Sequence, residues 1–404
     1  MWQNAQFRAY LGNTGFSGLA LAMQQLLLSW SLIGILELPA DEVGFLQALI
    51  GVPSIFFMLW GGARSDSHDP KRLLIFIYLV APVFPIFLAM ADLAGGFQVW
   101  SVLIWGLGVS VVQAMSTPPQ QAILNRITQN RLQQGVTAAT AIGFLVQIVG
   151  LTLAGQLDRI GLALVLMFQA FSFVGAAWAM RYINSQPSPV AVTTSPLAQI
   201  RKGFEATWKS VVIRNVLIIN FISTIFNAGS FMTVFPFIVK RVYAGDAVLL
   251  SSLMAVFFGG AVVANSLLLR FTPLLRPGRV YLTLQLSRII VLVMLFVEGD
   301  LWLLVLGTFL WGMNMGITSN LARMIVQESA EEQYRGRILS VFSVSMVGSA
   351  PIGAIVLGII IERIGTLEAL LPAMLVSVVL AAYGMFFTPL WNYQSVPAES
   401  ANET

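Results

Sequence analysis

The side chains of this 404-residue chain that could bind a polar solute are mainly amides set within long apolar stretches. Asn13 and Gln24 are eleven residues apart and Asn220 and Asn227 are seven apart, so each pair lies close to one face of a helix. Such amides either bind a solute or form hydrogen bonds to a neighbouring helix. Each bond between helices contributes roughly 1 kcal/mol. The sequence supports the two roles equally. The predicted cavity residues are Asn13, Gln24, Gln113, Gln147, Asn220, Asn227 and Asn314.

Aromatic and thioether side chains are abundant in the apolar stretches. A pocket that combines amides with such walls suits a bulky, amphipathic and mostly neutral solute. Most of these apolar residues must nevertheless contact lipid or other helices. Those near the amides are Phe56, Phe57, Met58, Trp60, Phe144, Phe226, Phe231, Phe235 and Met313.

Charged side chains are scarce within the apolar stretches. No Asp or Glu lies at the centre of one, and Arg288 is the one charge well inside. Proton-coupled transport usually relies on a carboxylate or histidine within the membrane. Asp92 and Asp158, at the ends of their stretches, are therefore predicted coupling residues together with Arg288. Arg288 can also bind an anion, although a structural or snorkelling arginine is the favoured interpretation.

Several classes of chemistry lack their usual residues. The chain has no cysteine, and its one histidine, His68, is interpreted as an ordinary loop residue. Thiolate and His-based metal sites, cofactor chemistry and a membrane-embedded enzyme are therefore not expected. No Gly-x-x-x-x-Gly-Lys-Ser/Thr loop is present, so ATP hydrolysis by the chain is not expected.

The elements that must position these residues are membrane-spanning helices. The chain is 57% hydrophobic and 10% charged, and a helix of about 20 apolar residues crosses a bilayer. An all-α integral membrane protein with 12 spans is predicted. The expected spans are 10–36, 43–63, 73–92, 98–117, 136–157, 161–180, 214–239, 247–269, 280–297, 301–322, 338–361 and 369–388.

The distribution of basic residues predicts the orientation. With both termini in the cytoplasm, 18 of the 22 Lys and Arg residues fall on the cytoplasmic side, as the positive-inside rule requires. The net charge of +4 is thus attributed to membrane orientation, and no nucleic-acid partner is expected.

A polar connection between spans six and seven divides the chain. It begins with a Pro-containing segment and continues, at 197–208, with apolar residues at helical spacing. This spacing predicts a short amphipathic helix on the membrane surface, with a simple tether as the equal alternative. The predicted domains are an N-terminal six-helix bundle (1–181), a cytoplasmic linker (182–213), a C-terminal six-helix bundle (214–390) and a disordered cytoplasmic tail (391–404).

Short echoes indicate that the two bundles are repeats. Asp158-Arg159 recurs as Glu362-Arg363 after 204 residues, and Trp105-Gly106 recurs as Trp311-Gly312 after 206. Repeated bundles that rock about a central site are typical of secondary transporters.

The loop after the second span carries the most specific motif. Here the sequence resembles the major facilitator superfamily, whose pattern in this loop is Gly-x-x-x-Asp-Arg-x-Gly-Arg-Lys. Gly62, Asp66, Lys71 and Arg72 occupy matching positions. Together with the spans, the linker and the repeat, the resemblance covers essentially the whole chain.

The loop departs from that pattern in a distinctive way. Ser67 replaces the usual Arg, and Asp69-Pro70 replaces Gly-Arg. This variant resembles bacterial enterobactin and macrolide exporters of the superfamily. The resemblance implies two pseudo-symmetric six-helix bundles, with spans one, four, seven and ten lining the cavity.

The resemblance also implies a conformational latch. In the family, the Asp at the position of Asp66 latches the two halves on the cytoplasmic side. A basic pair around a glycine, which precedes span eleven, resembles the same branch and is its predicted partner. The predicted latch residues are Gly62, Asp66, Lys71, Arg72, Arg335, Gly336 and Arg337.

The sequence therefore predicts a secondary transporter of a bacterial inner membrane. It would export amphipathic small molecules, drugs or siderophore-like compounds, as a monomer working by alternating access and proton antiport. An inward solute symporter or a lysophospholipid flippase of the same fold is the first alternative. A transporter-like sensor without flux is an alternative of another class.

Overall fold

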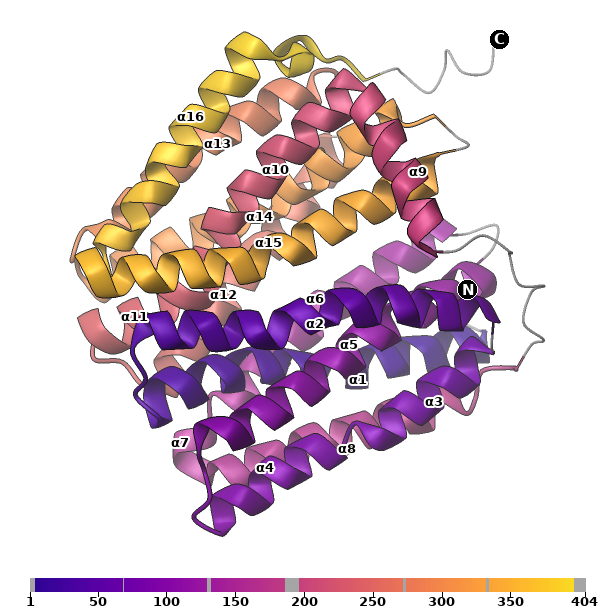
Figure 1. Cartoon of the computed structure of the whole chain (residues 1–404), viewed down its shortest axis with the longest axis vertical. Helices are drawn as coiled ribbons and strands as arrows, with labels where there is room; N and C mark the ends of the chain where they lie inside the picture. The colour runs from indigo at the N-terminus through magenta and orange to yellow at the C-terminus, as the bar shows by residue number, and fades with distance from the viewer. Residues whose placement is uncertain are drawn as a thin grey trace. The chain divides into compact units, whose positions relative to one another are not determined.

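The fold is described by a computed structural model that covers residues 4–67, 69–128, 132–185, 196–271, 274–331 and 334–395. Within these ranges twelve helices are long and apolar enough to cross a membrane, and no strand is present. The predicted all-α fold with twelve spans is confirmed. Figure 1 shows the helices in chain order.

The chain forms two compact units. The first comprises residues 1–193 and 239–255, and the second comprises 194–238 and 256–404. The predicted domain boundaries remain a prediction. The helices of the first unit are α1 (Ala5–Trp30), α2 (Ala40–Ser67), α3 (Pro70–Val80), α4 (Val83–Leu93), α5 (Val99–Thr128), α6 (Leu132–Ala154), α7 (Leu157–Ile160) and α8 (Leu162–Met180).

The second unit contains the remaining helices, except that the first nine residues of α12 belong to the first unit. Its helices are α9 (Pro196–Lys209), α10 (Val211–Gly229), α11 (Phe235–Phe237), α12 (Ala247–Phe271), α13 (Pro277–Phe296), α14 (Leu301–Ser329), α15 (Arg335–Ile364) and α16 (Leu371–Phe387). Short π-helical turns at Ser31–Ile35, Ser230–Val234 and Ile238–Val242 and 3₁₀ turns at Glu368–Leu370 and Pro389–Asn392 complete the fold.

The elements repeat with the displacement seen in the sequence. Helix α1 begins at Ala5 and α10 at Val211, and the sixth and twelfth spans begin at Leu162 and Glu368. Both intervals are 206 residues. The short sequence echoes therefore reflect a repeated order of helices.

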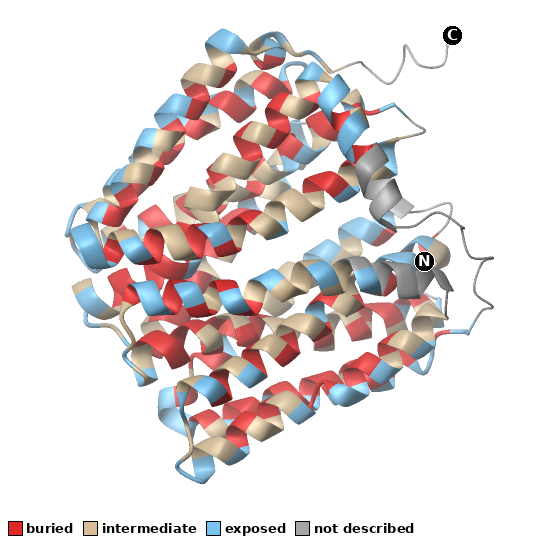
Figure 2. Cartoon of the chain, viewed as in Figure 1, coloured by how far each residue is buried: buried red, intermediate tan, exposed pale blue. Residues whose placement is uncertain are grey.

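Each unit is held together by apolar helix faces. In the first unit α1 contacts α6 and α8, and α2 contacts α5; in the second, α10 contacts α15, and α13 contacts α14 and α16. Figure 2 shows buried residues along these contacting faces. The side chains of Tyr78 and Phe173 stack in the first unit, with ring centroids 6.3 Å apart.

Helix α9 crosses the beginning of α15 within the second unit (Figure 1). A Cβ atom on Gly203 would lie 2.8 Å from the backbone oxygen of Arg337, so glycine permits this close approach. The exposed rings of Phe204 and Trp208 stack on the same helix, with centroids 5.2 Å apart.

Candidate functional site

Asn13 lies within a network of hydrogen bonds between helices of the first unit. Its Nδ2 donates to the backbone oxygen of Ala176 at 3.0 Å, and its Oδ1 accepts from Gln120 Nε2 at 3.1 Å. Gln120 Nε2 also lies within bonding distance of Ser17 Oγ and Tyr78 Oη. The side chain of Asn13 is fully buried and connects α1, α5 and α8.

Gln24 contributes to a second interhelical network in the same unit. Gln169, which is fully buried on α8, donates from Nε2 to Gln24 Oε1 at 3.1 Å and to Ala20 O at 3.0 Å. Its Oε1 accepts from Trp105 Nε1 at 3.1 Å. Gln169 was not among the predicted residues, although its type within an apolar span signals a buried amide.

Gln147 lies nearer the surface of the unit. Its Nε2 donates to Gln25 Oε1 at 2.7 Å, and both side chains are half-buried. The pair connects α6 to α1 within their membrane-spanning stretches. Gln113, on α5, is exposed. Gln25 is a polar residue that the sequence analysis missed, although it directly follows Gln24.

A buried charge lies in the second unit where α10, α13 and α14 meet. Arg288 is 4% exposed. Its Nη1 donates to Ser223 Oγ at 2.6 Å and to Gln285 Oε1 at 2.7 Å, while Nε and Nη2 lie 3.3 and 3.2 Å from Asn314 Oδ1. Among the described residues no carboxylate forms a salt bridge with Arg288.

Asn314 orients this arginine. Its Nδ2 donates to the backbone oxygen of Leu284 at 2.8 Å and to Ser287 Oγ at 3.0 Å. With the amide nitrogen fixed in this way, Oδ1 is directed at the guanidinium. The sequence placed Asn314 and Arg288 in different roles, but the structure brings them into contact.

Asn227 forms the more exposed edge of the cluster. It is half-buried, and its Nδ2 donates to Ser223 O at 2.8 Å and lies 3.3 Å from Ser223 Oγ. Its Oδ1 is buried without a hydrogen-bond partner in the described part of the chain, as is Nδ2 of Asn220. Asn227 is therefore linked to Arg288 through Ser223.

An aromatic cluster lies about one helical turn from these residues. Phe231 stacks on Phe257 with centroids 4.1 Å apart, and Trp311 meets Phe231 and Phe235 edge-on at 5.7 and 5.8 Å. Phe231, in the π-helical turn after α10, follows Asn227 by four residues, and Trp311 precedes Asn314 by three on α14. All four rings are buried.

A further amide pair contains none of the predicted residues. Asn320 Nδ2, on α14, donates to Asn265 Oδ1, on α12. Asn320 is exposed and Asn265 is half-buried. Polar atoms this accessible on apolar helices require water, a solute or lipid headgroups around them.

Of the two predicted coupling carboxylates, Asp158 has a distinctive contact. Its Oδ2 accepts from the backbone N–H of Ala247, the first residue of α12, at 3.2 Å within the first unit. Seven residues before Ala247, Lys240 forms a salt bridge, with its Nζ 3.4 Å from Glu37 Oε1. Asp92 is half-buried at the end of α4.

The loop motif is described in part. Helix α2 extends to Ser67, but the side chains of residues 61–68, including Asp66 and His68, lie outside the described part of the structure. Asp69 caps α3 by accepting from the N–H of Lys71 at 3.0 Å, with Pro70 at the first helical position. These two departures from the family pattern thus form a favourable helix start.

The basic residues of the two motifs lie in different settings. Lys71 Nζ donates to Arg181 O at 3.0 Å, whereas Arg72 is largely exposed and lies 3.9 Å from Asp69 Oδ2. In the second unit Arg335 is exposed, and the guanidinium of Arg337 lies 5.9 Å from the ring centroid of Tyr334.

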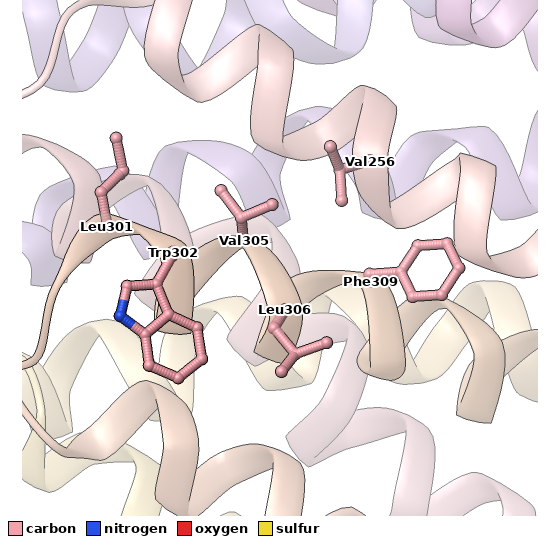
Figure 3. Close-up of a pocket in the computed structure, with 6 residues that line it drawn as sticks. All are labelled: Val256, Leu301, Trp302, Val305, Leu306 and Phe309. Carbon is pink, nitrogen blue, oxygen red and sulfur yellow. The ribbon is translucent and has the colours of Figure 1, made fainter.

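An apolar groove of about 660 Å³ lies along α14 (Figure 3). It is lined by Val256 from α12 and by Leu301, Trp302, Val305, Leu306 and Phe309 from α14. None of these side chains can accept a hydrogen bond, and only the Trp302 indole can donate one. The groove suits a hydrocarbon chain better than a polar solute.

Comparison with known proteins agrees with this architecture. The sequence model of the Major Facilitator Superfamily matches residues 11–354. A search of curated proteins finds no match. Transporters of this superfamily bind small molecules within a membrane, typically as monomers, and are generally not enzymes.

Solved structures of low sequence identity share the fold. A bacterial homologue of the human lysosomal transporter Spinster, inward-facing and unoccupied, has a TM-score of 0.72 at 14% identity, over 98% of this chain and 99% of that one. The nucleoside transporter NupG has 0.70 at 14%, over 96% and 99%. A bacterial homologue of the iron transporter ferroportin, inward-facing, has 0.65 at 16%, over 93% and 98%. The described residues include twelve apolar helices, and the family match covers most of the chain's length. The chain therefore belongs to the Major Facilitator Superfamily and is a multi-pass membrane protein of secondary transport.

Proposed function

We propose that this transporter exports amphipathic small molecules, such as drugs or siderophore-like compounds, by alternating access. The observation that carries the proposal is a set of partly exposed amides within apolar membrane-spanning helices. They are the Gln25–Gln147 pair in the first unit and Asn227 and the Asn265–Asn320 pair in the second.

The physical argument concerns the cost of polar groups in a membrane. An amide that faces hydrocarbon loses its hydrogen bonds to water at a cost of several kcal/mol. A partly accessible amide within a membrane is stable only where water or a solute can form hydrogen bonds with it. Apolar and aromatic neighbours can contact the apolar part of the same solute. The set therefore suits solutes with a few polar groups on a large apolar body.

Proton antiport is the proposed energy source, with Asp158 as the first candidate. A carboxylate near a helix N-terminus is stabilised by the helix dipole and by the amide that it binds. Protonation of Asp158 would remove this charge from the start of α12, where Oδ2 accepts from Ala247 N–H. Proton binding would thereby be linked to the position of α12. Asp92 is the second candidate.

The charge bias favours a bacterial inner membrane with both termini in the cytoplasm. By the same bias, the linker proposed between the two bundles (182–213) and the tail proposed after the second bundle (391–404) lie on the cytoplasmic side. The proposed bundles are 1–181 and 214–390. The unusual loop around Asp69-Pro70 favours the enterobactin and macrolide exporter branch.

Flux measurements in inside-out membrane vesicles test the direction of transport. With an imposed proton gradient, a radiolabelled amphipathic drug should accumulate inside the vesicles, and collapsing the gradient should abolish the accumulation. The Gln25→Ala/Gln147→Ala variant should reduce uptake. Uptake in right-side-out vesicles alone would refute export and favour the inward symporter, whereas binding without flux in either orientation would favour a sensor.

One observation favours a second candidate, a lysophospholipid flippase. The apolar groove of Val256 and α14 suits an acyl chain. A fluorescent lysophospholipid that changes leaflet only in proteoliposomes containing the protein would support this candidate over drug export.

The latch role proposed for Asp66 yields a further prediction. Asp66→Asn keeps the size of the side chain and removes its charge, so folding and membrane insertion should be intact while transport falls at least about tenfold, equivalent to 1.4 kcal/mol. The vesicle assay measures the change, and immunoblotting of the membranes controls for the amount of protein. Undiminished transport by Asp66→Asn would remove the latch from the mechanism.

A further inference from the structure

The buried guanidinium of Arg288 has neutral neighbours and no counter-charge in the described part of the chain. Its hydrogen bonds go to Ser223, Gln285 and Asn314. Hydrogen bonds to neutral groups leave the positive charge itself uncompensated. An ionisable residue within a membrane is by default a candidate for an ion or substrate site.

We propose that the Arg288 cluster, defined as Ser223, Asn227, Gln285, Arg288 and Asn314, binds the carboxylate of an amphipathic solute. This inference rests on the proposed function, because it names the class of solute that the transporter takes. The solute is an aryl or alkyl monocarboxylate, and its carboxylate supplies the negative charge that the cluster lacks.

The hydrogen-bonding capacity of the cluster leaves room for such a group. A guanidinium has five N–H donors, and the four hydrogen bonds of Arg288 leave one N–H of Nη2 without a partner among the described residues. A carboxylate accepts several hydrogen bonds and pairs well with a guanidinium. The guanidinium therefore has the capacity to donate to one further strong acceptor in addition to its existing bonds.

Asn227 provides the approach to the charge. It is half-buried, whereas Arg288 and Ser223 are buried, and its amide nitrogen contacts Ser223, which in turn contacts Arg288. A solute that reaches Asn227 thus lies one hydroxyl group from Nη1, and the N–H without a partner belongs to Nη2 of the same guanidinium, on the side of Asn314. The amide can turn from Ser223 O to the incoming carboxylate, since a carboxylate is the stronger acceptor.

The surroundings determine what the carboxylate is attached to. The aromatic cluster of Phe231, Phe235, Phe257 and Trp311 begins about one helical turn from Asn227 and Asn314. An apolar, ring-containing body beside the acid group matches these neighbours better than a small inorganic anion.

A matched pair of probes tests this inference on the full-length protein purified in detergent. 1-Naphthoate and 1-naphthamide share one ring system, but only the first is charged at pH 7. Calorimetry should show naphthoate binding at least about tenfold more tightly to the unsubstituted protein, because hydrogen bonds to charged groups are the stronger ones. Arg288→Gln should abolish the preference while naphthamide still binds.

The control is Arg276→Gln, which removes the same charge from an exposed residue at the start of α13. It should retain the preference for naphthoate. Equal affinities of the unsubstituted protein for the two probes would overturn the inference, as would a preference that survives Arg288→Gln.

A second variant covers the case in which Arg288→Gln does not fold. Asn227→Leu leaves the arginine in place and should weaken naphthoate binding more than naphthamide binding. An equal effect on both probes would also overturn the inference. The proposed function is judged separately, by flux of a neutral amphipathic drug in vesicles.

Discussion

Gly260→Ala is expected to destabilise the second unit by about 1–3 kcal/mol, the usual cost of overfilling a close contact. A Cβ atom at Gly260 would lie 2.2 Å from the backbone oxygen of Phe309 and 3.1 Å from the backbone nitrogen of Met313. Backbone atoms cannot move aside as a flexible side chain can. Helices α12 and α14 would therefore have to separate.

The same contact depends on glycines of α14. Gly312 and Gly316 are four residues apart and approach Phe257 and Ala261 of α12, the first with only 1.8 Å between its ideal Cβ position and Phe257 O. This small-x-x-x-small spacing allows close helix association in membranes, where hydrocarbon tails remove the usual hydrophobic drive. One methyl group at Gly260 thus disturbs an extended interface.

The adjacent glycine is the matched control. Beyond the adjoining backbone of its own helix, no atom lies within 4 Å of the Cβ position at Gly259, and alanine is the better helix former. Gly259→Ala should be neutral or slightly stabilising. The midpoint of thermal unfolding, followed in detergent by the monomer peak on size-exclusion chromatography, compares the variants. Equal midpoints for Gly259→Ala and Gly260→Ala would contradict the proposed backbone contact.

The number and type of helices could be predicted because length and apolarity determine membrane spans directly. The ends of the spans could be predicted less accurately. The fourth span was predicted to end at 117, but α5 continues through Pro118 and Pro119 to Thr128. Prolines interrupt helices in water, whereas in a membrane bundle neighbouring helices can satisfy the freed backbone groups. Similarly, α14 extends to Ser329. Its end was predicted at 322 because Arg323, Gln327 and Glu328 lower the hydropathy of the last turns.

The individual roles of the amides could not be predicted in the same way. Sequence spacing places residues on a helix face but does not say which partner lies opposite. Asn13 meets Gln120, and Gln24 meets Gln169. Both predicted cavity residues are thus hydrogen-bonded between helices, and their role in binding stays a prediction. The contact between Arg288 and Asn314 could not be predicted for the same reason, because the two residues lie on different helices.

Gln169→Leu is expected to have the second large effect, a destabilisation of the first unit by about 1–2 kcal/mol. The substitution preserves the approximate size of the side chain but removes three interhelical hydrogen bonds. Trp105 Nε1 loses its acceptor, and Gln24 Oε1 loses its donor. Gln24 Nε2 already lacks a partner among the described residues, so its entire side-chain amide would be left unsatisfied in a buried position.

Gln24→Leu provides the comparison, because it removes only one of these bonds. Gln169 would keep its donation to Ala20 O and its acceptance from Trp105. The thermal midpoint should therefore fall less for Gln24→Leu than for Gln169→Leu. The double variant should lose less stability than the sum of the two single losses, since residues in one hydrogen-bond network are not independent. Strict additivity, or a larger loss for Gln24→Leu, would contradict Gln169 as the centre of the network.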